Sequence, residues 1–269
     1  MSDRDLAADL DLALELAEAA DAFTIPRYER QDFTLGWKDN RTEVTEADRG
    51  TETLIVTRLL DARPDDAIYG EEHGAQGEAG SPWRWVIDPI DGTSGFVRGI
   101  PVWATLIALT HAELGSVVGV VSAPAIRRRW WAARRLGAFA DGRSCRVSEV
   151  AELDEAQVCV TFSPGWDDVG LTHELVKIVQ QARRARGFGD FWQHCLVAEG
   201  AIDLAIDAVE VMPYDLAAVK VIVEEAGGTF TDRHGRDTYE GEGAVSSNGR
   251  LHRHAIERLT DSGPASRAP

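Results

Sequence analysis

The sequence predicts an α/β (α+β) protein, and three observations lead to that prediction. Two segments with helical spacing of apolar residues open the chain, short apolar runs separated by turn residues follow, and strand-like and helix-like segments alternate from about residue 155. With 269 residues, 44% of them hydrophobic, the chain can bury a substantial core. We expect two halves, residues 1–150 and 151–269, that form one integrated unit.

The first half begins with two amphipathic helices, over residues 6–16 and 47–60, and a turn-forming segment follows the second. Mostly strands come next, antiparallel in part. Apolar runs predict them at residues 67–70, 84–88, 104–110 and 116–124, and residues 128–142 have the pattern of a hairpin. Residues 71–82 combine glycine with charge, which predicts a mobile loop at a working edge.

The second half alternates strands and helices, which is typical of an α/β layer. Strands are predicted within residues 157–163, 183–189, 201–207 and 228–232, and helices within residues 171–182, 191–200, 214–228 and 251–259. A dinucleotide-binding oxidoreductase would need GxGxxG between a strand and a helix, and the sequence lacks that motif.

The charge of the chain limits its partners. Lys and Arg total 28 against 45 Asp and Glu, a formal net charge of -17, which repels nucleic acid phosphates and anionic membrane surfaces. Cys145, Cys159 and Cys195 form no CxxC pair, and the acidic N-terminus has no basic segment or cleavage site. We therefore expect a cytoplasmic protein with reduced thiols that binds neither nucleic acid nor membranes.

The segment "DPIDGT", residues 88–93, is the strongest chemical signal in the sequence. Asp88 and Asp91 end an apolar strand, and Pro89 between them removes a backbone donor, so we expect the strand to stop there. Two such carboxylates repel each other unless neutralised, and magnesium selects hard oxygen ligands. Gly92 permits close backbone approach, and a helix beginning at Thr93 provides N–H groups for an anion.

Other acidic residues also lie at element ends. Glu71 and Glu72 follow an apolar run, while Asp48 and Asp215 lie in the first turns of predicted helices. Simple helix capping also explains Asp48 and Asp215, and solvated surface explains Glu72. Taken one at a time, these residues leave both interpretations open.

In that order, "TEAD" (45–48), "GEE" (70–72), "DPIDGT" and "YDLAA" (214–218) resemble the motifs of the inositol monophosphatase-like magnesium-dependent phosphatases over nearly the whole chain. The resemblance implies a layered αβαβα sandwich, a homodimer, and two or three Mg²⁺ ions that bridge the phosphate of a small phosphorylated substrate. Position by position, it implies metal ligands at Glu71, Asp88, the Ile90 carbonyl, Asp91 and Asp215. It also implies catalytic roles for Glu71 and for the dyad of Thr93 and Asp48, which activates water.

Within the family, the segments 96–109, 122–142 and 189–205 resemble the actinobacterial histidinol-phosphate phosphatases. This implies hydrolysis of L-histidinol phosphate in histidine biosynthesis. The alternatives are inositol 1-phosphate or a broader range of sugar and nucleotide phosphomonoesters. A phosphate sensor that lost turnover is a different class of answer, and the retained water-activating dyad argues against it.

Substrate contacts are the least determined part of the site. An amine-bearing substrate favours a carboxylate at the rim, and Asp190, Asp207 and Glu210 are candidates, although Asp190 also fits an N-cap. Arg186 is a candidate phosphate ligand or a salt-bridged surface residue. The resemblance adds Lys38 before the dyad and a phosphate grip at Gly92, Thr93 and Ser94, and it places Gly95 where the family commonly has asparagine.

Two further groups of side chains are interpreted without a chemical role. Trp130 and Trp131, flanked by arginines, are expected in the core or a dimer interface rather than in a nucleic-acid platform. His252 and His254 are expected at the surface.

Overall fold

The structure, a computed structural model, describes residues 4–37 and 43–260. The helices are α1 (Leu6–Arg30), α2 (Glu46–Ala62), α3 (Thr93–Val97), α4 (Pro164–Asp168), α5 (Thr172–Gln181), α6 (Asp190–Ala198), α7 (Pro213–Glu225) and α8 (His252–Thr260), with 3₁₀ turns η1 (Pro124–Ile126) and η2 (Leu153–Glu155). The strands are β1 (Leu35–Trp37), β2 (Glu43–Thr45), β3 (Ala67–Gly70), β4 (Gly74–Gly77), β5 (Trp83–Asp91), β6 (Ala104–His111), β7 (Gly115–Ala123), β8 (Arg128–Ala133), β9 (Gly137–Ala140), β10 (Arg143–Ser144), β11 (Gln157–Val160), β12 (Arg184–Arg186), β13 (Leu204–Ile206), β14 (Thr229–Thr231) and β15 (Val245–Ser247).

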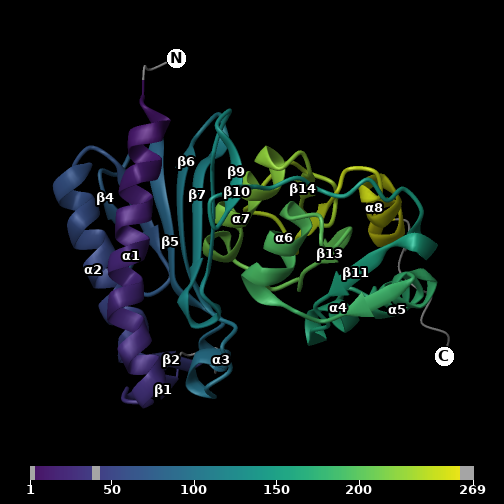
Figure 1. Ribbon diagram of the computed structural model, residues 1–269, viewed down its shortest axis with the longest axis horizontal. Helices are drawn as coiled ribbons and strands as arrows, with labels where there is room; N and C mark the ends of the chain where they lie inside the picture. The colour runs from purple at the N-terminus through teal and green to yellow at the C-terminus, as the bar shows by residue number, and fades with distance from the viewer. Residues whose placement is uncertain (1–3, 38–42, 261–269) are drawn as a thin grey trace.

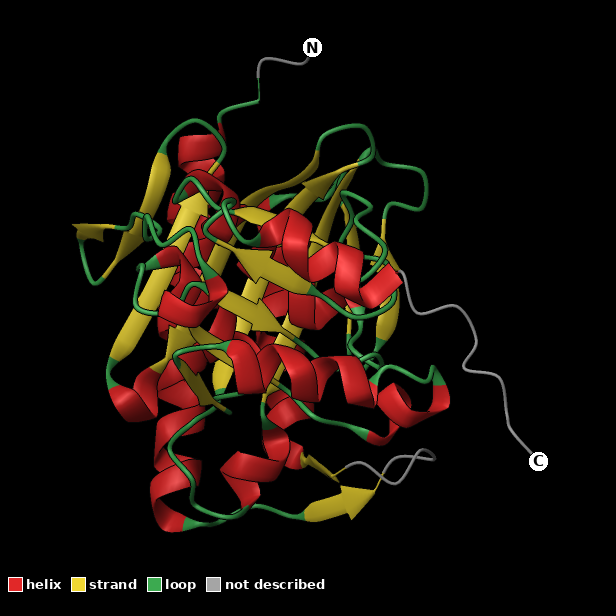
Figure 2. Cartoon of the chain, turned by 90° about the vertical axis from the view of Figure 1, so that its right-hand side faces the viewer, coloured by secondary structure: helices red, strands yellow, loops and turns green. Residues whose placement is uncertain are grey.

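Five layers are visible in Figure 1. Helices α1 and α2 cover one face of an eight-stranded sheet, and α6 and α7 lie between that sheet and a five-stranded sheet. Helices α4, α5 and α8 cover the outer side of the second sheet and face the viewer in Figure 2. Separate clusters of buried apolar residues fill the spaces between layers. The expected αβαβα sandwich is confirmed.

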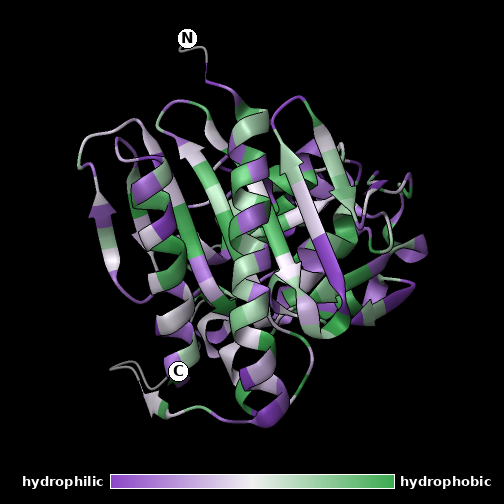
Figure 3. Cartoon of the chain, turned by 60° about the vertical axis from the view of Figure 1, so that its left-hand side comes forward, coloured by the Kyte–Doolittle hydropathy of each residue, from purple (hydrophilic) through white to green (hydrophobic). Residues whose placement is uncertain are grey.

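Helix α1 extends well beyond the predicted residues 6–16. Asp5 caps its start by accepting hydrogen bonds from the Ala7 and Ala8 amides, and Gln31 ends it in the left-handed conformation. Small side chains such as Ala13, Ala17 and Ala20 are buried against the sheet. Figure 3 shows hydrophobic and hydrophilic residues in alternation along this helix, as expected for an element with one face in water.

The eight strands of the first sheet follow the order β10-β9-β8-β7-β6-β5-β3-β4. All neighbouring pairs are antiparallel except β3 and β5, which run parallel. The hairpin predicted for residues 128–142 is present as β8 and β9. Residues 71–82, predicted to form a loop, instead include β4, which pairs with β3. The glycines there belong to a hairpin, so that prediction was wrong in part.

Strand β5 does not stop at Pro89, contrary to expectation. It pairs with β6 up to Asp88 opposite Leu106, shifts register, and resumes with Asp91 opposite Ala104. The shift removes Pro89 from the regular ladder, so its missing N–H leaves no gap in the pairing. Both aspartates therefore project from one continuous strand, on either side of a bulge.

Helix α7 packs directly against β7, where Gly119 has no side chain. A Cβ atom at Gly119 would lie 2.4 Å from the Ala218 carbonyl oxygen and 2.6 Å from Val221 Cγ1. Any larger residue would push α7 away from the sheet. The position of α7 matters because it presents Asp215 to the strand end that holds Asp88.

The five-stranded sheet has the order β12-β11-β13-β15-β14. Strands β12, β11 and β13 run parallel, and β15 pairs antiparallel with both β13 and β14. The predicted alternation of strands and helices is present, but β15 and the short helix α4 were not predicted.

Trp130 is fully buried between the first sheet and α6, 6.0 Å from the Phe191 ring, which agrees with the expected core position. The surface prediction for His252 is wrong, because it is buried and bonded to Thr231 and Ser247, whereas His254 is exposed. No helix within residues 4–37 and 43–260 is long and apolar enough to cross a membrane.

Candidate active site

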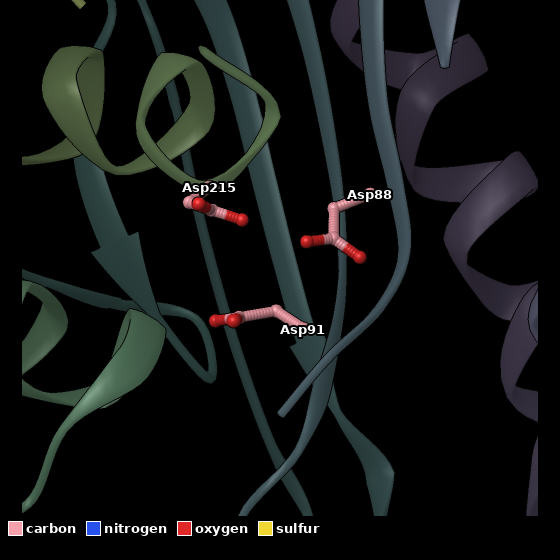
Figure 4. Close-up of side chains that lie close together, drawn as sticks. All are labelled: Asp88, Asp91 and Asp215. Carbon is pink, nitrogen blue, oxygen red and sulfur yellow. The ribbon is translucent and has the colours of Figure 1, made fainter. Parts of the chain in front are cut away.

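Three aspartates from two distant segments converge at one point. Asp88 and Asp91 project from the end of β5, and Asp215 comes from the first turn of α7. One carboxylate oxygen of each lies within 4.8 Å of the others. Figure 4 shows the three side chains directed toward a common space between strand and helix. This is the group of carboxylates among the described residues that could hold a metal ion.

Asp88 is buried at the centre of this group. Its Oδ1 accepts a hydrogen bond of 3.0 Å from the Ile90 amide, which fixes the carboxylate over the bulge. Burial raises the pKa of Asp88 well above its ordinary value, and the neighbouring carboxylates, first that of Glu71, raise it further. The site is therefore electrostatically unfavourable for Asp88 without a cation.

Asp91 is held by the amino end of α6. The Phe191 amide donates to Asp91 Oδ2 at 2.7 Å, so a helix from the second half of the chain orients a carboxylate from the first. Burial raises the pKa of Asp91 well above its ordinary value, and Asp190 is the first of the carboxylates that add to the rise. Nothing in the local sequence around Asp91 indicated this contact.

Asp215 occupies the third position of α7 and caps that helix. Its Oδ2 accepts from the Met212 amide at 2.6 Å. Burial raises the pKa of Asp215 to about 7, and the Glu71 carboxylate contributes to the rise. The capping interpretation is thus correct for Asp215, and its carboxylate belongs to the acidic cluster as well.

The Asp48 and Thr93 side chains lie beside this cluster. Thr93 Oγ1 is 2.8 Å from Asp48 Oδ1 and 2.9 Å from the Ile90 carbonyl oxygen. The other oxygen of Asp48 accepts from the Thr45 amide and hydroxyl in a capping box at the start of α2. Burial raises the pKa of Asp48. The structure therefore brings together the two residues of the predicted dyad.

Backbone geometry explains the glycines after Asp91. Gly92 has φ of 83°, a left-handed conformation, and begins α3 at Thr93. A Cβ atom at Gly95 would lie 2.8 Å from the Val102 carbonyl oxygen. Because the Val102 backbone occupies this space, position 95 has no room for the asparagine that is common in the inositol monophosphatase-like family. Ser94 is bonded through its hydroxyl and carbonyl to Arg98.

A cavity of about 340 Å³ opens at these residues. Twelve residues line it: Glu43, Glu71, Asp88, Ile90, Asp91, Gly92, Thr93, Ser94, Glu210, Met212, Tyr214 and Asp215. The cavity thus contains every predicted metal ligand and the predicted phosphate-side residues from 92 to 94. Lys38 lies outside the described residues.

The predicted substrate residues occupy different positions around the site. Glu210 lines the cavity, held by Ser163 Oγ at 2.7 Å and the Gly165 amide at 2.8 Å. Asp207 is buried and bonded to His194 Nε2 at 3.0 Å. Arg186 is exposed on the edge strand β12 and donates to the Ala185 carbonyl. Asp207 and Arg186 are not among the residues that line the cavity.

Asp190 begins α6 but does not cap it. The N-cap is Gly189, and Asp190 has φ of 48°, a strained conformation for an aspartate. Asp190 as a whole is exposed, but its Oδ2 lies close to Gly92. A Cβ atom added at Gly92 would be 3.4 Å from this oxygen. Burial of the carboxylate raises the pKa of Asp190 to about 6, and Asp207 adds to the rise. The N-cap interpretation is wrong, and the carboxylate lies next to the phosphate-side turn.

Two acidic residues around the site, Glu43 and Glu52, were not identified from the sequence, and the sequence left the role of Glu72 open. Glu43 lines the cavity and pairs with Arg98 at 3.0 Å. Glu52 is buried and accepts from the Glu72 and His73 amides at 2.8 Å each, which holds the turn that carries Glu71. The Glu72 side chain is almost fully buried, so the solvated-surface interpretation is wrong. Glu52 lies on the buried face of α2, and this position in the helical pattern could have identified it from the sequence as a buried carboxylate.

The donor set fits a hard divalent cation. Carboxylate oxygens from Asp88, Asp91 and Asp215 converge, and Glu71 and the Ile90 backbone line the same cavity. Their mutual repulsion in a buried place is relieved by bound positive charge, and hard cations select such oxygen ligands.

Comparison with known proteins identifies the family of the chain. The sequence matches the inositol monophosphatase family over residues 5–263, and the chain belongs to that family. It is 47% identical over 253 residues to the histidinol-phosphatase of Streptomyces coelicolor, covering 91% of this chain and 94% of the relative. It is 44% identical over 256 residues to the histidinol-phosphatase of Mycobacterium tuberculosis, covering 93% and 97%. The crystal structure of the extragenic suppressor protein SuhB from Bartonella henselae is similar, with a TM-score of 0.86, 28% identity, and coverage of 95% and 100%.

Proposed function

We propose that the chain is a metal-dependent phosphomonoesterase that hydrolyses L-histidinol phosphate to L-histidinol and phosphate in histidine biosynthesis. The observation that carries the reaction type is the convergence of Asp88, Asp91 and Asp215 next to the hydrogen-bonded pair of Thr93 and Asp48. The substrate is proposed because relatives at 47% and 44% identity over most of the chain are named histidinol-phosphatase.

The proposed cofactor is Mg²⁺, with two or three ions in each active site. Glu71, Asp88 and the Ile90 carbonyl would hold one ion, and Asp88, Asp91 and Asp215 a second. Magnesium bound there supplies positive charge beside the phosphoryl group and lowers the pKa of a bound water. The proposal is supported by the oxygen donors that line the cavity and by the raised pKa of Asp88.

The Thr93 hydroxyl is proposed to orient the attacking water and pass its proton toward Asp48. Thr45 holds one oxygen of Asp48, so the other oxygen is directed at Thr93. Burial raises the pKa of Asp48, which makes it a better proton acceptor than an exposed aspartate. The turn at Gly92, with the backbone and hydroxyls of residues 93 and 94, is proposed to hold the phosphate oxygens.

The amine of the substrate is proposed to bind near Asp190 and Glu210. Glu210 lines the cavity, and the Asp190 carboxylate lies against Gly92, so both are within the acidic side of the site. A charge-assisted hydrogen bond to an ammonium group stabilises a complex by about 1.5 to 3 kcal/mol. Asp207 and Arg186 remain predicted substrate residues that do not line the cavity, and Lys38, outside the described residues, also remains a prediction.

A substrate panel at fixed magnesium tests this proposal. Histidinol phosphate should have the highest kcat/KM, above inositol 1-phosphate, fructose 1,6-bisphosphate and 3'-phosphoadenosine 5'-phosphate. If another phosphomonoester is hydrolysed best, the substrate assignment is wrong although the phosphatase assignment stands. No turnover of any member with any divalent cation would contradict both.

The Asp190→Asn variant tests the amine contact. We expect kcat/KM for histidinol phosphate to fall at least roughly tenfold more than kcat/KM for inositol 1-phosphate, which has no amine. The matched control is Asp168→Asn, which changes an exposed aspartate of α4 outside the cavity and should leave kcat/KM unchanged for both substrates. Equal losses on both substrates would assign Asp190 a structural role.

Three further expectations belong to the proposal: a homodimer, a cytoplasmic location, and a division into residues 1–150 and 151–269. The division is supported by the change from the first sheet to the second between β10 and β11. Size-exclusion chromatography with light scattering tests the dimer.

A further inference from the structure

A second cavity, of about 510 Å³, lies at the opposite end of β5 from the metal cluster. It is formed by strand ends of the first sheet, the turn before β5, Lys220 of α7, and residues 237–240. It shares no lining residue with the active-site cavity. Its volume is within the range of small-molecule sites. The charged and aromatic polar residues that line it are Arg84, His111, Glu113, Lys220, Asp237, Tyr239 and Glu240.

The fixed groups of this cavity are hydrogen-bond donors. The Lys220 side chain is only 5% exposed, which places a cation inside the protein at the cavity wall. Arg84 donates to the buried Tyr239 hydroxyl at 3.0 Å, and that hydroxyl keeps its own hydrogen to donate. His111 Nδ1 accepts from the Glu113 amide at 3.2 Å, which leaves the ring hydrogen on Nε2.

Lys220 pairs with Glu224 on the same helix, and the other two acidic partners of these donors have exposed side chains. Asp237 pairs with Lys220, but its side chain is 81% exposed. Glu240 pairs with Arg84 at 2.5 Å, and its side chain is 51% exposed. Both acids belong to a segment outside the helices and strands, between β14 and β15. The exposed pair of Arg84 and Glu240 contributes little to stability, and an incoming anion can take the place of Asp237 while Lys220 keeps Glu224 as its second partner.

We propose that this cavity is a binding site for a small organic or inorganic oxyanion, separate from the metal site. The ligand oxygens would take the places of the Asp237 and Glu240 carboxylates on Lys220, Arg84 and Tyr239. Arg84 and Lys220 face this cavity together with the carboxylates of Glu113, Asp237 and Glu240, so an anion binds there by displacing Asp237 and Glu240. It goes beyond the proposed function and does not depend on it.

The position of the site connects it to the metal cluster. Arg84 lies on β5, which carries Asp88 and Asp91 at its other end. Lys220 lies on α7, five residues after Asp215. A ligand in this cavity therefore contacts both elements that present the metal-cluster aspartates.

Isothermal titration calorimetry of the full chain, stripped of metal with EDTA and then dialysed into a metal-free buffer without EDTA, tests the proposal. Without metal, the acidic active site repels anions, so binding there does not contribute, and the result does not depend on catalysis. The probes are inorganic phosphate and sulfate in one arm, and malonate and citrate in the other. We expect saturable binding in at least one arm, and the arm that binds more tightly identifies tetrahedral or carboxylate ligands.

Two variants of opposite expected sign identify the site. Arg84→Gln should weaken binding roughly tenfold or more, because one charge-assisted contact is lost. The double variant Asp237→Asn, Glu240→Gln should bind several-fold more tightly, because both internal competitors lose their charge. All three substitutions change exposed or half-exposed side chains, so the fold should persist. The control is Arg183→Gln, an exposed arginine outside the cavity, which should leave binding unchanged.

The proposal is overturned by an absence of saturable binding in both arms. It is also overturned if binding is the same in wild type, Arg84→Gln and the double variant, because the ligand would then occupy another surface.

Discussion

Replacing Asp215 with asparagine should make the metal-free protein more stable. A carboxyl whose pKa is about 7 in the folded protein, against an ordinary value of 3.8, destabilises the fold at pH 8 by about 4 kcal/mol. This is an upper value, because Asp88 and Asp91 can take up protons in its place. Asparagine keeps an oxygen for the Met212 amide, so the helix cap survives the change.

The sign of the pH dependence follows from the raised pKa. Below pH 3.8 the carboxyl is protonated in the folded and unfolded states, and the Asp215→Asn variant gains nothing. As pH rises from 3.8 to about 7, the unfolded chain ionises first, so the wild type loses stability relative to the variant. Above pH 7 the difference is constant. For a chain of this size, 4 kcal/mol corresponds to a Tm increase of roughly 8 to 16 °C.

Urea unfolding in EDTA, followed by tryptophan fluorescence at pH 4, 6 and 8, measures this difference. Saturating Mg²⁺ should reverse the order, because only the wild type retains the full ligand set and gains binding free energy on folding. The control is Asp203→Asn, since Asp203 is buried but outside the cluster, bonded to Ser148 Oγ and the Gln157 amide. The reasoning is refuted if Asp215→Asn is no more stable than wild type at pH 8 in EDTA.

Three other predictions test the site and the fold. Asp91→Asn should abolish turnover at millimolar Mg²⁺, and a magnesium titration showing near wild-type activity would remove Asp91 from the ligand set. In steady-state kinetics, Thr93→Ala should lower kcat more than it raises KM, since positioning a nucleophile matters mainly in the transition state. A change in KM alone would mean that Thr93 acts only in substrate binding. Burial lowers the pKa of His252 to about 4, so the wild type should lose about 3 kcal/mol of stability as pH falls from 6.5 to 4. In urea titrations the His252→Gln variant should not show this loss. The control variant His254→Gln changes an exposed histidine and should show the same loss as wild type.

The layers of the fold could be predicted because apolar periodicity reports burial directly. The course of β5 could not, because Pro89 was expected to end the strand and instead sits in a register shift. Whether a strand resumes after such a bulge depends on the neighbouring strand, here on the pairing of Asp91 with Ala104. That information lies in tertiary contacts, not in the local sequence.

For the active site, too, the local chemistry could be predicted from the sequence, but the contacts between distant segments could not. "DPIDGT" indicated a metal site from local chemistry, while Asp215 could be linked to it only through the family resemblance. The contact from the Phe191 amide to Asp91 depends on where α6 meets β5, a hundred residues away in sequence, and no local pattern encodes it. The substrate end was least predictable, because the cavity includes Glu210 but not Asp207, and only packing distinguishes the two.

Helix capping and a role in the active site are both interpretations of Asp48 and Asp215, and the structure shows why the two are compatible. A carboxylate has two oxygens, and in each of four aspartates at the site one oxygen is held by a main-chain N–H. The donors are the Thr45 amide for Asp48, the Ile90 amide for Asp88, the Phe191 amide for Asp91 and the Met212 amide for Asp215. Each side chain is thereby oriented by the backbone of a helix start or a bulge, which leaves part of its coordinating capacity for a cation or for Thr93. Rigid elements, rather than other side chains, set the geometry of the acidic cluster, so its ligands stay in place even while they repel one another.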